Sequence, residues 1–120
     1  MDTREAHIDY IEFPASDNAA LARFKAFYGA AFQWQFQDWA DNYADTASSG
    51  LNSGVNADAA NRPAKPLAVL YAADLEAARD RILAAGGTLT LDIFAFPGGR
   101  RFHFLDPAGN ELGVWSDQGI

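Results

Sequence analysis

The chain has 120 residues, of which 49% are hydrophobic and 21% are charged, a balance typical of one globular domain. Nine Lys and Arg residues against 16 Asp and Glu residues give a net charge of −7, which argues against nucleic acid or a membrane surface as a partner. The chain has no cysteine, which excludes disulfides, thiolate nucleophiles and cysteine-based zinc sites.

The chain from His7 onward predicts a strand followed by a helix. His7–Phe13 is rich in β-branched and aromatic residues and stops at Pro14. Ser16 or Asp17 can cap the helix, and Gly29 is its expected end. Spacings of three and four residues predict the buried face of this helix as Leu21, Phe24 and Tyr28.

Three further strands are expected in the first half. Phe32–Gln37 alternates strictly between aromatic residues and glutamines, which predicts a strand with one buried face. Tyr43–Ser48 and Leu51–Ala57 are smaller and more polar, and give weaker strand signals. Asp58–Lys65 is polar and contains proline, without periodicity. The sequence therefore predicts a first module over about residues 7–57 and a linker over about 58–65.

The order of elements then begins again. Pro66–Ala73 is apolar and predicts a strand, and Asp74 can cap a helix over Leu75–Ala85 that Gly86-Gly87 would end. Thr88–Ile93 alternates as a strand does. With a closing hairpin, the second module would cover about residues 66–117 of a single domain.

The two halves match at a fixed offset of 57 residues. The matching pairs are Asp17 with Asp74, Gly29 with Gly86, Phe32 with Leu89, Trp34 with Leu91, and Phe36 with Ile93. The same offset pairs Phe24 with Arg81, so the repeat concerns architecture more than residue identity. The offset therefore predicts that the chain contains two copies of a unit made of one strand, a helix and three strands.

The segment Arg100–Trp115 contains two β-rich runs separated by Asp106-Pro107-Ala108-Gly109-Asn110. Proline fixes one φ angle, Asp and Asn bond their own backbone, and glycine adopts positive φ, so a hairpin is expected. This hairpin and the duplication resemble the repeated module of the vicinal oxygen chelate superfamily, which includes glyoxalase I, bleomycin-resistance proteins and extradiol dioxygenases. The resemblance implies an α+β fold with two tandem βαβββ modules that form a partly closed barrel, with the helices outside and the ligand on the concave side.

The resemblance also implies where metal-dependent members hold their ion, on the first and last strand of each module. In this sequence those positions carry over to Tyr10, Asn56, Leu67 and Gly113. Leu67 and Gly113 have no donor atom in the side chain, and a divalent transition ion prefers imidazole or carboxylate ligands. We therefore expect no metal and no cofactor. His7 does not replace a ligand, because it lies on the opposite face of its strand from Tyr10.

Strand alternation predicts which side chains face the concave side. The candidate ligand-binding residues are Tyr10, Glu12, Val69, Tyr71, Glu111 and Trp115. An aromatic and apolar wall with two carboxylates suits a small organic molecule that has a flat or apolar part and a polar or cationic group. The alternative interpretation is that Tyr10, Tyr71 and Trp115 simply fill the barrel.

No catalytic residue is assigned from the sequence. For Glu12, a solvated role or a salt bridge with an arginine is favoured over a role as a base. His103 faces away from its neighbours Phe102 and Phe104, and a structural role is favoured, but whether that side is the cavity or the helix layer stays open. The Pro97–Arg101 segment predicts a mobile loop at the pocket rim, because an anion site would need a helix to follow it.

Three functions remain open. The first is a metal-free protein that encloses an aromatic or apolar small molecule, as the drug-sequestering branch of the superfamily does. The second is a metal-dependent lyase, isomerase or dioxygenase of the same superfamily, and the third is a structural or regulatory module whose aromatic residues pair two chains. We expect a homodimer, the commonest oligomer. We also expect a cytoplasmic protein, because the N-terminus lacks a signal peptide and no run approaches the roughly 20 apolar residues of a membrane span.

Overall fold

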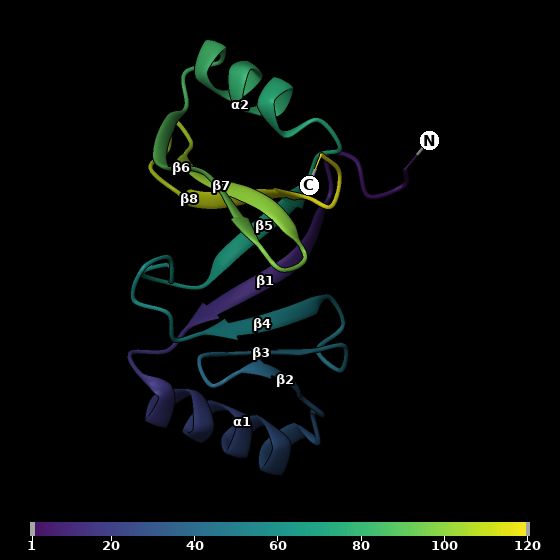
Figure 1. The fold of residues 1–120 in the computed structure, drawn as a ribbon, viewed down its shortest axis with the longest axis vertical. Coiled ribbons are helices and arrows are strands. Elements are labelled where there is room, and N and C mark those ends of the chain that lie inside the picture. The colour runs from purple at the N-terminus through teal and green to yellow at the C-terminus, as the bar shows by residue number, and fades with distance from the viewer. Residues whose placement is uncertain (1, 120) are drawn as a thin grey trace. The chain divides into compact units, whose positions relative to one another are not determined.

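The computed structural model describes residues 2–119, which form two βαβββ modules (Figure 1). The first module consists of β1 (Ile8–Pro14), α1 (Asn18–Phe32), β2 (Gln37–Ala40), β3 (Tyr43–Thr46) and β4 (Asn52–Asn56). The second consists of β5 (Leu67–Tyr71), α2 (Leu75–Ala84), β6 (Thr88–Phe96), β7 (Gly99–Leu105) and β8 (Glu111–Ser116). The predicted α+β class and the duplicated module are confirmed. Neither helix is long and apolar enough to span a membrane.

The chain divides into two compact units. One unit is Tyr10–Leu67, and the other joins the N-terminal segment up to Asp9 to the chain from Ala68 onward. In the first unit the strand order is β2-β3-β4-β1, and in the second it is β6-β7-β8-β5. In each unit the first strand of the module pairs in parallel with the last, and the remaining pairs are antiparallel. The two sheets therefore have the same topology.

In the first unit α1 packs on one face of its sheet (Figure 1). Asp17 caps the helix, because its Oδ1 accepts a hydrogen bond from the Ala20 N–H at 2.7 Å. Leu21 is buried, and the ring of Phe24 lies 5.4 Å from that of Phe13 on β1. The buried core residues are Ala15, Leu21, Ala44, Val55 and Ala57. On β1, the even-numbered residues, including Tyr10 and Glu12, lie on the other face of this sheet.

The predicted end of α1 at Gly29 and the predicted strand over Phe32–Gln37 are both wrong. The helix continues to Phe32 and ends at Gln33, whose φ of 57° reverses the chain while its N–H donates to the Gly29 carbonyl at 3.0 Å. Trp34 then stacks on Tyr28 with ring centroids 4.6 Å apart. The aromatic alternation thus serves packing around the end of the helix, and the strand starts only at Gln37.

In the second unit α2 covers one face of its sheet, as the sequence predicts (Figure 1). Asp74 is the cap, accepting from the Ala77 N–H at 3.0 Å, and Gly86 follows the helix with a φ of 101°. The helix and sheet bury a core of Ala72, Leu75, Ala78, Phe102, Phe104 and Val114. The offset of 57 residues therefore holds for the two helix caps and fails for the two helix ends.

The hairpin predicted around Asp106 is confirmed. Asp106 Oδ1 accepts hydrogen bonds from the N–H groups of Ala108 and Asn110, each at 2.9 Å, and Gly109 has a φ of 89°. These bonds, led by the one from the Asn110 backbone, lower the pKa of Asp106. The turn brings β7 and β8 into antiparallel register.

The predicted mobile loop over Pro97–Arg101 is wrong, because β7 already begins at Gly99. Arg100 and Arg101 are strand residues on opposite faces of the sheet. Arg100 turns toward α2, where its Nη1 and Nη2 contact the two carboxylate oxygens of Glu76 at 2.6 and 3.1 Å. Only Pro97 and Gly98 remain in the turn between β6 and β7.

Replacing Glu76 with glutamine is expected to make the free energy of unfolding depend less on pH in the acid range. The hydrogen bond from Arg100 lowers the pKa of Glu76 from 4.5 to about 2. A lowered folded-state pKa contributes stability that is present above pH 4.5 and is lost as the pH falls toward 2. Urea unfolding measured at several pH values across this window should therefore show a shallower slope for Glu76→Gln than for the wild type. Asp80→Asn on the same helix is the control, and a wild-type slope in Glu76→Gln would contradict the prediction.

Candidate functional site

The face of the second sheet turned away from α2 carries Arg101 and His103. On β7, Phe102 and Phe104 point into the core under α2, so the residues that alternate with them lie on the opposite face. The strand register places Arg101 beside Trp115 and His103 beside Gly113. The question of which face His103 occupies is thereby answered. Arg101 was missed as a site residue, although the same alternation with Phe102 could have identified it.

Two aromatic rings of β6 lie against Arg101 and His103. The guanidinium carbon of Arg101 lies 5.1 Å from the ring centroid of Phe94 and 5.9 Å from that of Phe96. The imidazole of His103 meets the Phe94 ring edge-on at 5.9 Å. Arg101 and His103 are both buried. The result is a strip of aromatic and basic groups on one sheet face.

Tyr71 and Trp115 lie side by side on the same face, where Trp115 is flanked by Tyr71 on β5 and by Arg101 on β7. Their ring centroids are 5.2 Å apart in an edge-to-face arrangement, and Tyr71 is fully buried. Tyr71 Oη donates to Asp117 Oδ1 at 2.7 Å, while Trp115 Nε1 donates to Asp9 Oδ1 at 3.0 Å. Burial and then the Asp117 carboxylate raise the pKa of Tyr71, and the hydrogen bond from Tyr71 lowers the pKa of Asp117. The remaining predicted residue of β5, Val69, is buried beside Gly113.

Glu111 is placed apart from this aromatic pair. It starts β8, four residues before Trp115, and its Oε2 accepts a hydrogen bond from Thr90 Oγ1 at 2.6 Å. The carboxylate is half-buried and is engaged by a neighbouring strand. The structure thus brings Val69, Tyr71 and Trp115 onto one face and leaves Glu111 at its edge.

In the first unit, Tyr10 and Glu12 meet Tyr43 and Asn56 on the face away from α1. Tyr43 Oη donates to Glu12 Oε1 at 3.0 Å, and the hydroxyls of Tyr10 and Tyr43 are 2.6 Å apart. Asn56 Nδ2 donates to Glu12 Oε2 at 3.3 Å. Since the single hydroxyl proton of Tyr43 is donated to Glu12, Tyr10 is the donor in its hydrogen bond with Tyr43. The buried Glu12 therefore orders two half-buried phenols. Tyr43 was missed because no local pattern ties β3 to β1.

The register of the two sheets changes one of the positions inferred from the family. Glu12 pairs with Gly54 as Val69 pairs with Gly113, so Gly54 is the structural counterpart of Gly113. The offset of 57 residues, which pointed to Asn56, does not persist because the helices and middle strands of the modules differ in length. Asn56 instead holds Glu12 and accepts from the Asp58 N–H at 2.8 Å.

The space that a side chain at position 54 would occupy is filled by the phenols of Tyr10 and Tyr43. A Cβ atom built there would overlap the hydroxyls of Tyr10 and Tyr43 and lie 2.9 Å from Tyr10 Cζ. No group of three or more His, Asp or Glu side chains within residues 2–119 is arranged to hold a metal ion. The hydroxyl pair occupies the place where a residue with a ligand side chain would have to project.

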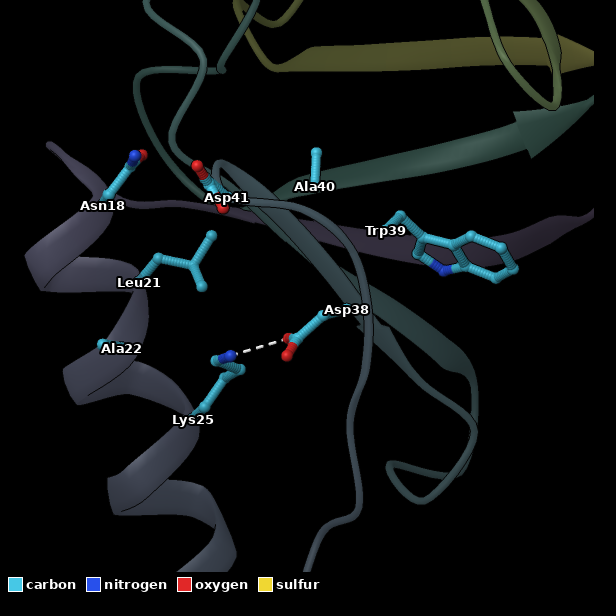
Figure 2. A pocket seen from close by; sticks show the side chains of 8 residues that line it. All are labelled: Asn18, Leu21, Ala22, Lys25, Asp38, Trp39, Ala40 and Asp41. Carbon is cyan, nitrogen blue, oxygen red and sulfur yellow. Dashed lines mark hydrogen bonds and ion pairs between the residues drawn. The ribbon is translucent and has the colours of Figure 1, made fainter.

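Two surface hollows lie beside the helices of the units. Figure 2 shows the first, of about 520 Å³, between α1 and β2, with the ion pair of Lys25 Nζ and Asp38 Oδ1 at 2.6 Å across it. The Trp39 ring points away from the helix there, and no predicted site residue contributes. The second, of about 250 Å³, is largely apolar, lies under α2 and includes Tyr71. The first hollow contains none of the hydrogen-bonded groups described above and the second contains only Tyr71, so we assign the candidate site residues to the sheet faces.

Comparison with known proteins gives a consistent picture of the fold. A family model described as a glyoxalase-like domain matches residues 13–115. The Mn(II)-bound glyoxalase from Novosphingobium aromaticivorans is similar at 24% identity and a TM-score of 0.65, and the match covers 95% of this chain and 40% of that one. Methylmalonyl-CoA epimerase from Mycobacterium tuberculosis is similar at 14% identity and a TM-score of 0.63, with 97% of this chain and 92% of that one covered. NAD-dependent benzaldehyde dehydrogenase from Legionella pneumophila is similar at 12% identity and a TM-score of 0.72, with 89% of this chain and 96% of that one covered. No curated protein matches. At these identities the structural likeness shows the fold alone.

Proposed function

Because the chain belongs to the glyoxalase-like domain family, within the vicinal oxygen chelate superfamily, we propose that it binds a small organic molecule without a metal ion, on the sheet face of the second unit that is turned away from α2. The ligand would have an aromatic or apolar part, matched by Val69, Tyr71 and Trp115. A polar group of the same unit, such as the Asp117 carboxylate that accepts from Tyr71, would orient it.

The observation that carries this proposal is the chemistry of the positions where metal-dependent members hold their ion. Two of them are Gly54 and Gly113, and a third is Leu67, none of which has a side-chain donor. The fourth, Tyr10, shares its hydroxyl proton with Tyr43. Transition ions require several imidazole or carboxylate ligands. The residues present therefore do not fit a metal ion at these positions.

Metal retention tests the metal-free part of the proposal. The purified protein is incubated with Mn²⁺, Ni²⁺ or Zn²⁺, desalted, and analysed for bound metal by elemental mass spectrometry. We expect far less than one ion per chain, and no change in the thermal unfolding midpoint on adding EDTA. Retention of one ion per chain would overturn the metal-free assignment.

A second candidate function, a metal-dependent lyase, isomerase or dioxygenase, has one observation in its favour. His103 lies directly beside Gly113 in the strand register, so an imidazole is close to a position where the family holds a ligand. If retained metal were lost in a His103→Ala variant and kept in a His7→Ala control, this function would replace the first. Homodimerisation and a cytoplasmic location stay predictions, and the mass of the protein in solution tests the first of them.

A further inference from the structure

The guanidinium of Arg4 lies over a surface of the second unit that is formed by Tyr71, Trp115 and Asp117. Its Cζ is 3.9 Å from the ring centroid of Tyr71 and 5.5 Å from that of Trp115. Its Nη1 lies 3.1 Å from Asp117 Oδ2. Two ring faces and a carboxylate form the set of groups by which proteins recognise organic cations. The chain's own N-terminal segment thus shows what chemistry this surface accepts.

The walls of this surface are held in place without Arg4. Tyr71 is fully buried in β5, paired with Trp115 of β8, and its hydroxyl donates to Asp117. The indole of Trp115 is oriented by Asp9. Each wall therefore has its own hydrogen bond and its own place in the sheet. With the guanidinium removed, we expect the same rings and the same carboxylate to remain in position.

Arg4, in contrast, is held mostly by a residue that would move with it. Its Nε and Nη2 donate to the carboxylate of Asp2 at 3.0 and 2.6 Å, and only Nη1 reaches Asp117. The side chain is 36% exposed. The segment is anchored by its backbone instead, through the hydrogen bond from the Ala6 N–H to the Tyr71 carbonyl at 2.9 Å. The guanidinium can therefore leave with Asp2 while the segment stays attached.

We propose that Tyr71, Trp115 and Asp117 form a binding site for the cationic group of a small molecule, a guanidinium or a quaternary ammonium, and that Arg4 occupies the site until that group displaces it. The inference rests on the proposed function, since it names the chemistry of the ligand's polar group. The net charge of −7 adds a long-range attraction for a cation. Arg4 then competes with the ligand for the site, so a cationic group binds only if its affinity for the site exceeds that of the Arg4 guanidinium.

Choline and its neutral isostere 3,3-dimethylbutan-1-ol test the proposal on the full chain. The indole N–H signals of Trp34, Trp39 and Trp115 are followed by NMR on ¹⁵N-labelled protein during titration. We expect choline to shift the Trp115 signal saturably and to leave the other two in place. The neutral isostere should have no such effect at the same concentrations, because it lacks the charge that the rings and Asp117 recognise.

The Arg4→Gln variant should bind choline about tenfold more tightly than the wild type, since it no longer loses an ion pair and a cation–ring contact on binding. Arg23→Gln, on the exposed side of α1, is the control for net charge and should bind as the wild type does. Adding Asp117→Asn to Arg4→Gln should weaken binding again. Thermal unfolding checks that each variant is folded, and Arg4→Lys provides a second, milder change with an intermediate affinity expected.

Equal affinities of Arg4→Gln and Arg23→Gln for choline would overturn the proposal. So would equal shifts of the Trp115 signal by choline and by the isostere, or no shift by choline. These outcomes are separate from a failure of the proposed function, because stoichiometric metal retention would overturn metal-free binding while leaving the choline titration unaffected.

Discussion

Gly54→Ala is expected to lower the free energy of unfolding by about 2 kcal/mol, because the added methyl group forces apart the hydroxyls of Tyr10 and Tyr43. These hydroxyls are 2.6 Å apart, and Tyr43 is one of the donors to the buried carboxylate of Glu12. Overpacking would thus be combined with the loss of a hydrogen bond to a buried carboxyl group. Urea unfolding monitored by circular dichroism measures the change.

Two further variants make this prediction specific. Gly29→Ala adds the same methyl group inside α1, where the nearest atom is the Trp34 carbonyl oxygen at 3.7 Å, and should raise stability by about 0.5 kcal/mol through helix propensity. Tyr10→Phe introduced together with Gly54→Ala removes the hydroxyl that is overlapped most and should restore part of the loss. If Gly54→Ala were as stable as the wild type, the two phenols would not fill the space beside Gly54.

Gly99→Ala should be more damaging, with a loss of about 3 kcal/mol in the free energy of unfolding. A Cβ atom at this position would overlap the carbonyl oxygen of Ser116 and lie 3.0 Å from its carbonyl carbon. Both are backbone atoms of β8, so relief requires the strands to separate. Because β7 places Arg101 and His103 on the site face, the same change should disturb the signal of the Trp115 indole, which is paired with Arg101 in the register.

Gly98→Ala is the matched control, one residue earlier in the chain, in the turn that precedes β7. Its nearest neighbour would be Phe96 Cε2 at 3.1 Å, an atom of a side chain that is half-buried and able to shift. We expect a loss of less than about 1 kcal/mol for this variant. Equal losses for the two alanine variants would mean that the approach of β7 to β8 does not depend on Gly99.

The parts of the fold that were predicted are those with a local signal. Asp74 and Gly86 delimit α2 because a capping carboxylate and a glycine with positive φ act on the backbone within a few residues. The turn at Asp106 follows the same logic. Alternation placed Tyr10 and Glu12 on one face, and their shared contacts with Tyr43 agree with it.

The errors arose where distant segments decide the structure. Phe32–Gln37 has the period of a strand, but its aromatic rings find partners on α1, so tertiary packing outweighs the pattern. Tyr43 and Arg4 acquire their roles through contacts with Glu12 and Tyr71, far away in sequence, and no spacing rule connects them. Strand alternation thus predicted which side chains share a sheet face, whereas it did not predict which distant side chains they contact.

The outer strand of the first sheet bears on how the protein avoids aggregation. β2 has only four residues, its pairing with β3 slips between Asp38 and Ala40, and Asp38 carries a charge at the border of the sheet. Long, flat and uncharged borders recruit strands from other molecules, whereas short, kinked and charged ones resist this. Association of two copies by pairing of their β2 edge strands is therefore disfavoured, and this edge resists aggregation.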